Sequence, residues 1–323
     1  MVVVSCNQFI ILDTQDITKC CTLRWYTPDP GIKSPCLPRE HTSGVWNNKR
    51  CGEPEDLYKS GETSFPALSN LFWSIISVEA FVTSSVSIMA KPQTFGIVLY
   101  PGFQLTDVCG PLDVLNLLSS HFPTVSISLI GRELDPVATV PTPWPSNMGM
   151  LPFTSSQTLT PTHTFASAPQ LDVLVVPGGM GCFDPSPDAA GKPNMEVIDP
   201  IAEFVLKQYS GLKYLITVCT GSGIVSQTGL LDGKKATLFK GAWSVIPKWR
   251  KEVTWVPRAR WVVDGNIWTS SGVCSGTDLM FGFVKEIYGE EVAKGIATWM
   301  EYQRHEDPEV DPFGIEPDEE SSK

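Results

Sequence analysis

Short apolar runs alternate with amphipathic segments along the chain after residue 94. Short apolar runs bounded by glycine, proline or polar residues predict buried strands, and they span 95–100, 125–130, 171–176, 214–218 and 267–271. Segments with apolar side chains at helical spacing predict helices, and they span 107–119, 198–208, 221–231 and 277–288. Strands that alternate with helices predict a parallel sheet covered on both faces by helices.

The first 90 residues lack this regularity. Residues 1–66 show no sustained period and mix proline, cysteine, tryptophan and glycine with scattered charges. Residues 67–90 are apolar and near the length of a membrane span, but their many serine and threonine residues and the carboxylate of Glu79 disfavour one. A membrane contact through this segment stays a weak alternative. Residues 89–92 lead straight into the first predicted strand, so we expect residues 1–88 to be dispensable for the working protein.

These patterns divide the chain into three parts. Residues 1–90 are expected to form a poorly ordered N-terminal extension, and residues 91–305 the α/β domain. Residues 306–323, rich in Glu, Asp and Pro, are expected to form an acidic disordered tail. Within the domain, the proline-rich stretch 136–169 predicts loops with at most one hairpin.

Charge and cysteine usage narrow the class of protein. The net charge is −11 over 323 residues, with the acidity concentrated in the tail, and no basic stripe suits nucleic acid. The nine cysteines include no CxxC pair and no Cys/His cluster with zinc-like spacing. The start of the chain carries no secretory pattern. We therefore expect free thiols in the reducing cytoplasm and no metal site.

One cysteine stands where α/β proteins place reactive groups. Ligands of parallel sheets bind at the carboxyl ends of the strands, and Cys219 directly follows the predicted strand 214–218. Small residues follow it, as in a nucleophile elbow, where a sharp turn lifts a side chain above the sheet. The start of the next helix is expected to lower the pKa of its thiol. A buried, inert cysteine is the alternative.

Two other segments end at the same edge of the sheet. Asp107, just past the first strand, is either a helix-capping carboxylate or an acid–base partner of the cysteine. The pair Gly178 and Gly179, after the third strand, is either a simple turn or a source of backbone amides that can steady an anion. Cys274 opens the last predicted helix and is an alternative nucleophile, whereas Cys109 is best read as a packing residue.

Histidine places a limit on the chemistry. The chain contains four histidines, at positions 41, 121, 163 and 305. His163 lies in a Pro/Thr-rich loop and His121 at the end of a predicted helix, so neither is an evident base for Cys219. A Cys-His hydrolytic pair is therefore not evident.

Four motifs in this order resemble the ThiJ/PfpI superfamily. They are residues 100–111 (YPGFQLTDVCGP), 171–179 (LDVLVVPGG), 218–221 (VCTG) and 269–273 (TSSGV). Within that superfamily they look like the isonitrile hydratase-like branch in its fungal-type form. The resemblance covers about 94–313, and the first 90 residues have no counterpart in it.

The resemblance implies a flavodoxin-like α/β sandwich of the class I glutamine amidotransferase type, usually a homodimer. It implies Cys219 as the nucleophile in a strained backbone and Asp107 as its acidic partner. Thr220 matches the hydratase pattern, in which it is expected to act in catalysis by positioning the acid and the water, whereas the peptidase-type branch has histidine there. Backbone amides at Gly178, Gly179 and Gly221 are expected to bind substrate or an anion.

The function implied is hydration of an organic isonitrile, a small-molecule substrate, to an N-substituted formamide. The enzyme would be a hydro-lyase that needs neither a metal nor an organic cofactor. A glyoxalase-like or deglycating enzyme acting on small carbonyls is one alternative. A non-catalytic redox or ligand sensor, in which the cysteine is oxidised, is the other.

Overall fold

A computed structural model describes residues 2–5, 8–10, 26–28, 58–60 and 90–316. The chain divides into two units, 1–88 and 89–323. In the first unit, β1 (Val2–Ser5) pairs antiparallel with β2 (Gln8–Ile10), and β3 (Tyr26–Pro28) pairs with β4 (Tyr58–Ser60). We expected residues 1–90 to form a poorly ordered extension, with membrane contact through 67–90 as a weak alternative. Most of these residues lie outside the described part of the chain.

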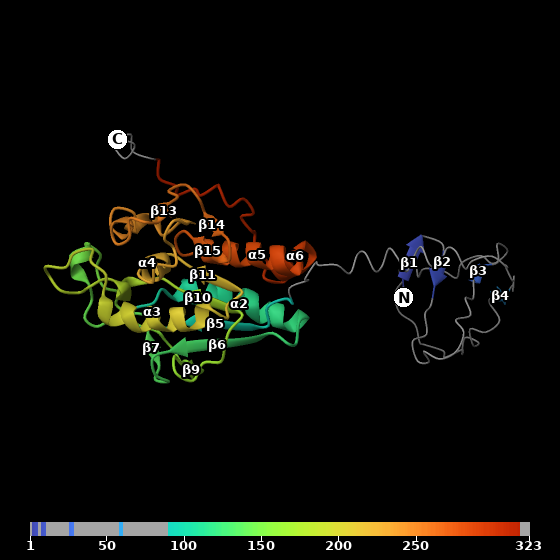
Figure 1. Cartoon of the computed structure of the whole chain (residues 1–323), viewed down its shortest axis with the longest axis horizontal. Coiled ribbons are helices and arrows are strands. Elements are labelled where there is room, and N and C mark those ends of the chain that lie inside the picture. Colours follow the sequence, from blue (N-terminus) through green and yellow to red (C-terminus); the bar gives the residue numbers. More distant parts are fainter. Residues whose placement is uncertain (1, 6–7, 11–25, 29–57, 61–89, 317–323) are drawn as a thin grey trace, which may run out of the picture. The chain divides into compact units, whose positions relative to one another are not determined.

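The second unit is built on one seven-stranded sheet. Its strands are β5 (Thr94–Val98), β6 (Ser126–Gly131), β9 (His163–Thr164), β10 (Val173–Val176), β11 (Tyr214–Thr217), β14 (Trp261–Asp264) and β15 (Ile267–Ser270). Their order across the sheet is β14-β15-β11-β10-β5-β6-β9. All neighbours are parallel except the edge strand β14, which is antiparallel to β15. The inner strands lie side by side in the part coloured cyan to red (Figure 1).

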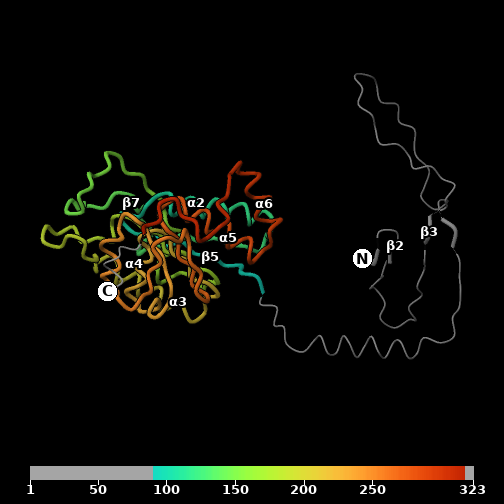
Figure 2. Tube along the Cα trace, turned by 90° about the horizontal axis from the view of Figure 1, so that it is seen from above, coloured from blue at the N-terminus to red at the C-terminus, as the bar shows by residue number. Residues whose placement is uncertain are grey.

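Helices cover both faces of this sheet. They are α2 (Leu105–His121), α3 (Met195–Tyr209), α4 (Gly221–Ser226), α5 (Ser275–Tyr288) and α6 (Glu290–Trp299). Helices α2, α5 and α6 pack on one another, and α3 packs on α4. In Figure 2, α2 and α6 lie toward one edge of the unit and α3 toward the opposite edge, with β5 between them. Every residue of β10 is buried, because helices shield the sheet on both sides.

Smaller elements complete the unit. The strands β7 (Val137–Ala138) and β8 (Thr158–Leu159) pair antiparallel, and β12 (Lys235–Ala236) pairs with β13 (Thr254–Trp255). Short 3₁₀ turns span Ser146–Met148, Met180–Cys182, Lys240–Ala242 and Ile246–Lys248. Within the part of the chain that the structure describes, no helix combines the length and the apolar character needed to cross a membrane.

The predicted α/β class and its mostly parallel sheet are confirmed. The helix expected over 221–231 ends earlier, at Ser226, and turns follow in which Gly229 has a φ of +78°. Strand β14 and helix α6 were not predicted. Helix α6 buries only Ala293, Ile296 and Ala297 among its ten residues. So few apolar positions give only a weak helical pattern in the sequence, and the helix was therefore missed. The stretch 136–169 holds the antiparallel β7–β8 pair and also β9, which joins the main sheet.

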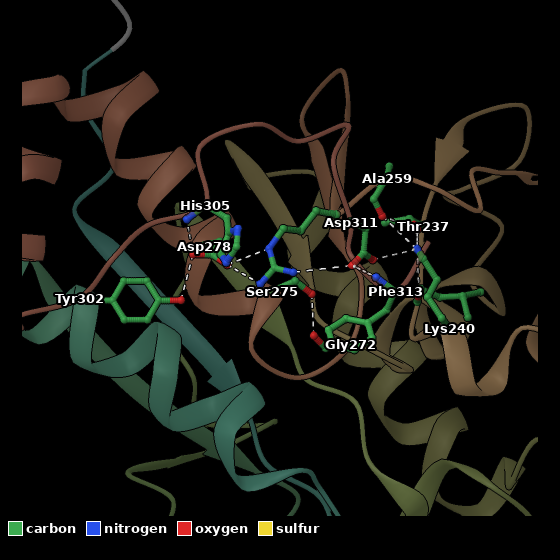
Figure 3. A network of polar contacts seen from close by, with 12 residues as sticks. Thr237, Lys240, Ala259, Gly272, Ser275, Asp278, Tyr302, His305, Asp311 and Phe313 are labelled. Carbon is green, nitrogen blue, oxygen red and sulfur yellow. Dashed lines mark hydrogen bonds and ion pairs between the residues drawn. The ribbon is translucent and has the colours of Figure 1, made fainter. Parts of the chain in front are cut away.

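Most residues of 306–316 are exposed, but the segment is attached to the domain: Arg260 N–H donates to Pro308 O at 2.8 Å, and Ile315 N–H donates to Pro257 O at 3.2 Å. The side chain of Asp311 is 1% exposed, and its carboxylate lies 3.7 Å from Lys240 Nζ and 3.7 Å from Arg260 Nη1. Arg260 in turn donates to Asp278 from Nε at 2.8 Å and from Nη2 at 2.5 Å. We call these four alternating charges the ionic clasp (Figure 3).

Asp278 also holds the chain that leads into this segment. Its Oδ1 accepts the Tyr302 hydroxyl at 2.9 Å and the His305 backbone N–H at 3.0 Å (Figure 3). The carboxylates of the clasp are buried because they meet buried cations, which a count of acidic residues in the sequence cannot reveal. Residues 317–323 lie outside the described part.

We predict that Asp311→Ala lowers the free energy of unfolding by about 2–4 kcal/mol, because Lys240 and Arg260 keep their buried charges without this partner. Urea denaturation of the full chain measures the change. Glu309→Ala, an exposed carboxylate of the same segment, is the matched control and should stay within about 0.5 kcal/mol of wild type. Equal effects of the two substitutions would contradict the buried role of Asp311.

Candidate active site

Cys219 sits on a strained turn, two residues after the last residue of β11. Its φ is +60°, a left-handed conformation that residues other than glycine rarely adopt. Both of its backbone polar groups are fixed from neighbouring segments: its N–H donates to Ser271 O at 3.0 Å, and its carbonyl accepts from Phe239 N–H at 3.4 Å. The side chain is 4% exposed. The surroundings therefore hold this residue in the elbow that the sequence predicts.

Gly221 allows the helix after the elbow to approach the sheet. A Cβ at this position would lie 2.2 Å from the carbonyl oxygen of Val176, at the end of β10. The Gly221 N–H donates to Val218 O at 2.9 Å, so it closes the turn. That bond occupies the amide, and the expected role of Gly221 in binding an anion does not fit its geometry. Its contribution is close packing.

Asp107 reaches the elbow because the loop before α2 is joined to the end of β10. Phe103 and Gly179 form an antiparallel bridge, and Gln104 N–H donates to Gly178 O at 2.8 Å. Asp107 lies in the first turn of α2 and is fully buried. The two segments meet although they are distant in the sequence, since β5 and β10 are neighbours in the sheet.

The two carboxyl oxygens of Asp107 have different surroundings. Oδ2 accepts the Gly178 N–H at 2.9 Å. Oδ1 is buried and has no hydrogen-bond partner, and the carboxyl lies close to the Cys219 thiol. Burial raises the pKa of Asp107 to about 8, against the smaller lowering effects of Gly178 and Cys219. With this pKa the side chain is mostly protonated at pH 7.

The sequence predicts a lowered pKa for the Cys219 thiol, but in the structure its surroundings raise this pKa. Burial, and next the nearby Asp107, raise the pKa of its thiol well above the usual value. The N–H groups of Thr220 and Val273 donate toward the sulfur and act against this. The six-residue helix α4 and these two amides lower the thiol pKa by less than burial away from water raises it. With its pKa raised in this way, the Cys219 thiol is protonated at neutral pH.

The amides of the glycine pair are already engaged. Gly178 N–H holds Asp107, and Gly179 N–H donates to the Thr220 hydroxyl at 2.8 Å. The expectation that these two amides bind substrate or an anion therefore differs from the structure, in which they position Asp107 and Thr220. A Cβ on Gly178 would lie 2.4 Å from Thr220 N and 2.9 Å from Cys219 Cβ, so no larger residue fits there.

Tyr100 and Cys182 belong to the same cluster and were not singled out from the sequence. Cys182 Sγ lies 3.1 Å from Gly179 O and 3.5 Å from Thr220 Oγ1. The Tyr100 hydroxyl donates to Pro177 O at 3.3 Å, and both side chains are buried. Tyr100 opens the quoted motif YPGF, and Cys182 follows the glycine pair. Both residues lie in or beside motifs that contain candidate site residues, and this was the only feature of the sequence that could have identified them.

Other candidates lie apart from this cluster. Cys274 is exposed at the N-terminus of α5, and Cys109 is half-buried on α2. Neither is among the groups that shift the pKa of Cys219. Among the residues that the structure describes, no three His, Cys, Asp or Glu side chains converge in a way that could hold a metal ion.

The ionic clasp supports the loop that supplies the Val273 amide. Ser271, whose carbonyl fixes Cys219, donates its own N–H to Arg260 O at 2.8 Å. The Ser275 hydroxyl donates to Gly272 O at 2.6 Å and closes the loop (Figure 3). The backbone carbonyl of Arg260 thus holds Ser271, whose own carbonyl accepts the Cys219 N–H, while the guanidinium group of Arg260 bonds to Asp278 in the ionic clasp.

In a comparison with known protein families, this chain matches the model of one family. The model of the DJ-1/PfpI family matches residues 95–286. An isonitrile hydratase from Pseudomonas putida is 32% identical over 208 residues, which cover 64% of this chain and 77% of that protein. The HTH-type transcriptional regulator GbdR of Pseudomonas aeruginosa is 25% identical over 219 residues, 66% of this chain but 52% of the regulator. A ThiJ/PfpI family protein from Pseudomonas syringae superposes with a TM-score of 0.50 at 25% identity, over 70% of this chain and 85% of that chain.

The protonation of Asp107 predicts a pH-dependent stability. Its pKa of about 8 in the folded protein lies above the usual value of 3.8. The folded state then binds more protons than the unfolded state between these two values, so stability is lost as the pH rises from about 4 through 8. Asp107→Asn removes this loss. Relative to wild type, its free energy of unfolding should rise by about 3–4 kcal/mol between pH 5 and pH 8.

Denaturation curves at several pH values measure this difference. Asp113→Asn, an exposed aspartate on the same helix, is the matched control and should follow the wild-type profile. A parallel pH dependence of Asp107→Asn and wild type would mean that Asp107 is ionised in the folded protein at neutral pH.

Proposed function

The chain belongs to the DJ-1/PfpI family, and from this membership and the geometry of the site we propose that it hydrates an organic isonitrile to an N-substituted formamide. The observation that carries the proposal is a buried carboxyl, Asp107, which accepts the Gly178 N–H through Oδ2 and lies beside the Cys219 thiol on its strained elbow. The similarity to an isonitrile hydratase over most of its length supports it.

In the first half-reaction, the Cys219 sulfur forms a bond to the terminal isonitrile carbon. The same carbon takes a proton from Asp107, and Asp107 recovers a proton from the thiol through its other oxygen. The product is a thioimidate, R–N=CH–S–Cys219, and the acid is unchanged. No net charge has to be created inside the buried site, which suits an acid and a thiol that are both neutral there.

In the second half-reaction, water attacks the thioimidate carbon. Its oxygen bonds to carbon and one of its protons goes to nitrogen, which gives a tetrahedral intermediate. Collapse forms the formamide carbonyl and breaks the carbon–sulfur bond, and the hydroxyl proton returns to sulfur through Asp107. The Thr220 and Val273 amides, already directed at the sulfur, stabilise the charge that develops on it. The sum is R–NC + H₂O → R–NH–CHO.

The same features disfavour a redox sensor. Oxidation by peroxide requires a thiolate of low pKa that solvent can reach. Cys219 is buried and its thiol pKa is raised. A glyoxalase-like reaction uses the same thiol, and none of the described contacts favours it over the hydration. Methylglyoxal turnover without added glutathione is the assay that separates it from the hydratase.

We further propose that the enzyme acts as a homodimer in the cytoplasm and needs no cofactor. The support is its family membership and the free thiols of the described part. Light scattering on the purified full chain measures the mass in solution. A monomer that is active at assay concentrations would contradict the dimer.

We predict that purified protein converts an alkyl isonitrile to the formamide and that Cys219→Ala abolishes the reaction, since the carbon–sulfur bond cannot form. Formamide is followed by mass spectrometry. Cys274→Ala removes an exposed thiol and should keep the wild-type rate. No formamide from wild type with several isonitriles, or full activity of Cys219→Ala, would refute the proposal.

The pKa of Asp107, raised to about 8, also sets the expected pH profile. The acid form that protonates the isonitrile carbon is lost above this value, so kcat/KM should fall about tenfold per pH unit there. Asp107→Asn should lower kcat/KM by about 10²–10⁴ and remove this limb. A rate that increases up to pH 10 would instead point to attack by a pre-formed thiolate and to no role for Asp107 as the acid.

A further inference from the structure

Two buried hydroxyls flank the elbow, one on each side of Cys219. Thr217 is the last residue of β11, and Ser222 lies in the first turn of α4. Both side chains are fully buried. Thr217 Oγ1 and Ser222 Oγ lie 2.7 Å apart, which is hydrogen-bond distance. This bond joins the strand before the cysteine to the helix after it, so it spans the turn on which the cysteine sits.

The direction of this bond follows from the second partner of Ser222. Ser222 Oγ lies 2.8 Å from the backbone carbonyl oxygen of Thr237, which can only accept. A hydroxyl carries one proton and two lone pairs. Ser222 therefore donates its proton to Thr237 O and accepts the proton of Thr217. Loss of the Ser222 hydroxyl would leave the Thr217 hydroxyl without this acceptor and Thr237 O without this donor, both in a buried place.

Thr237 belongs to the segment that holds the carbonyl of Cys219. Two residues further along the chain, the Phe239 N–H donates to Cys219 O at 3.4 Å. Thr237 is itself fixed, because its hydroxyl accepts from Lys240 Nζ at 2.6 Å next to the ionic clasp (Figure 3). The hydroxyl of Ser222 thus ties together the strand before the elbow, the helix after it and the segment that supports it.

These bonds bear on the conformation of Cys219. A φ of +60° at a residue other than glycine costs energy and persists only where the surroundings impose it. The bonds to the Cys219 N–H and carbonyl fix its two peptide groups, whereas Ser222 fixes the separation of the two ends of the turn. Without this bond the turn is free to relax toward an ordinary conformation, and the sulfur then moves relative to the Asp107 carboxyl.

We propose that Ser222 is a positioning residue for the Cys219 nucleophile: its hydroxyl holds the two ends of the elbow together and thereby keeps the sulfur in place for the substrate carbon. Ser222 donates its proton to Thr237 O throughout, and no bond of the hydration forms or breaks at its side chain. The kinetic part of this inference rests on the proposed hydration, whereas the effect on the position of the thiol does not.

The first experiment compares Ser222→Ala with wild type, as full chains, with an alkyl isonitrile as substrate. We expect kcat to fall about tenfold and KM to change less than about twofold, because the chemical step depends on where the sulfur is held. Ser226→Ala is the matched control: this serine is also buried in α4, but its hydroxyl donates to Gly223 O at 2.7 Å within the same helix. It should keep the wild-type kcat. Equal losses in the two variants would overturn the inference.

Substitutions at Thr217 separate the hydroxyl from packing. Thr217→Val keeps the shape of the side chain and loses the hydroxyl, whereas Thr217→Ser keeps the hydroxyl and loses a methyl group. We expect Val to lower kcat at least about threefold and Ser to stay within about twofold of wild type. Thr217→Val combined with Ser222→Ala should be no slower than Ser222→Ala alone. The reverse order of the two Thr217 variants, or additive losses, would overturn the inference.

Alkylation of Cys219 by iodoacetamide, followed by peptide mass spectrometry, tests the position of the thiol without the hydration. The buried thiol should react slowly in wild type. We expect Ser222→Ala to raise this rate at least about threefold, because a relaxed turn exposes the sulfur, and Ser226→Ala to leave it unchanged. A wild-type alkylation rate in Ser222→Ala would overturn the inference. Wild type that forms no formamide would refute the proposed function, and the alkylation rates would still decide the role of Ser222.

Discussion

The left-handed backbone of Cys219 is the constraint on which the site depends. A non-glycine residue keeps a φ of +60° only where its surroundings fix it. Here Ser271 O and Phe239 N–H hold it from the two sides. Because of this conformation the sulfur leaves the line of β11 and meets the amides of Thr220 and Val273, together with the carboxyl of Asp107. Each of these partners comes from a different loop at the same edge of the sheet.

Burial decides how the acid and the thiol share their protons. In water an aspartate is ionised at pH 7 and a cysteine is mostly a thiol. Inside the protein the cost of a charge outweighs the hydrogen bonds from Gly178 and the sulfur, so Asp107 also becomes neutral. A neutral pair is a poor peroxide sensor but suits the addition of S–H across a neutral substrate. These electrostatics support the proposed hydration.

The support for this arrangement extends to the C-terminal segment. Arg260 donates through its guanidinium group to Asp278 and approaches Asp311, while its backbone carbonyl accepts from Ser271. The segment that contains Asp311 is thus tied, through one arginine, to the loop that fixes Cys219. A stretch that is acidic and proline-rich in sequence becomes part of the support for the site, because Lys240 and Arg260 are buried where its carboxylate arrives.

The sequence by itself determined the main alternation of strands and helices, without β14 or α6, and placed Cys219 at a strand end, because hydrophobic periodicity and turn residues act over a few neighbouring positions. It predicted Asp107 at the same edge of the sheet only through the parallel topology and the family resemblance. Tertiary structure alone decided that the amides of Gly178 and Gly179 are occupied, that the thiol pKa rises, and that the Tyr100 hydroxyl donates to Pro177 O. These properties depend on burial and on contacts between distant segments, which no local pattern encodes.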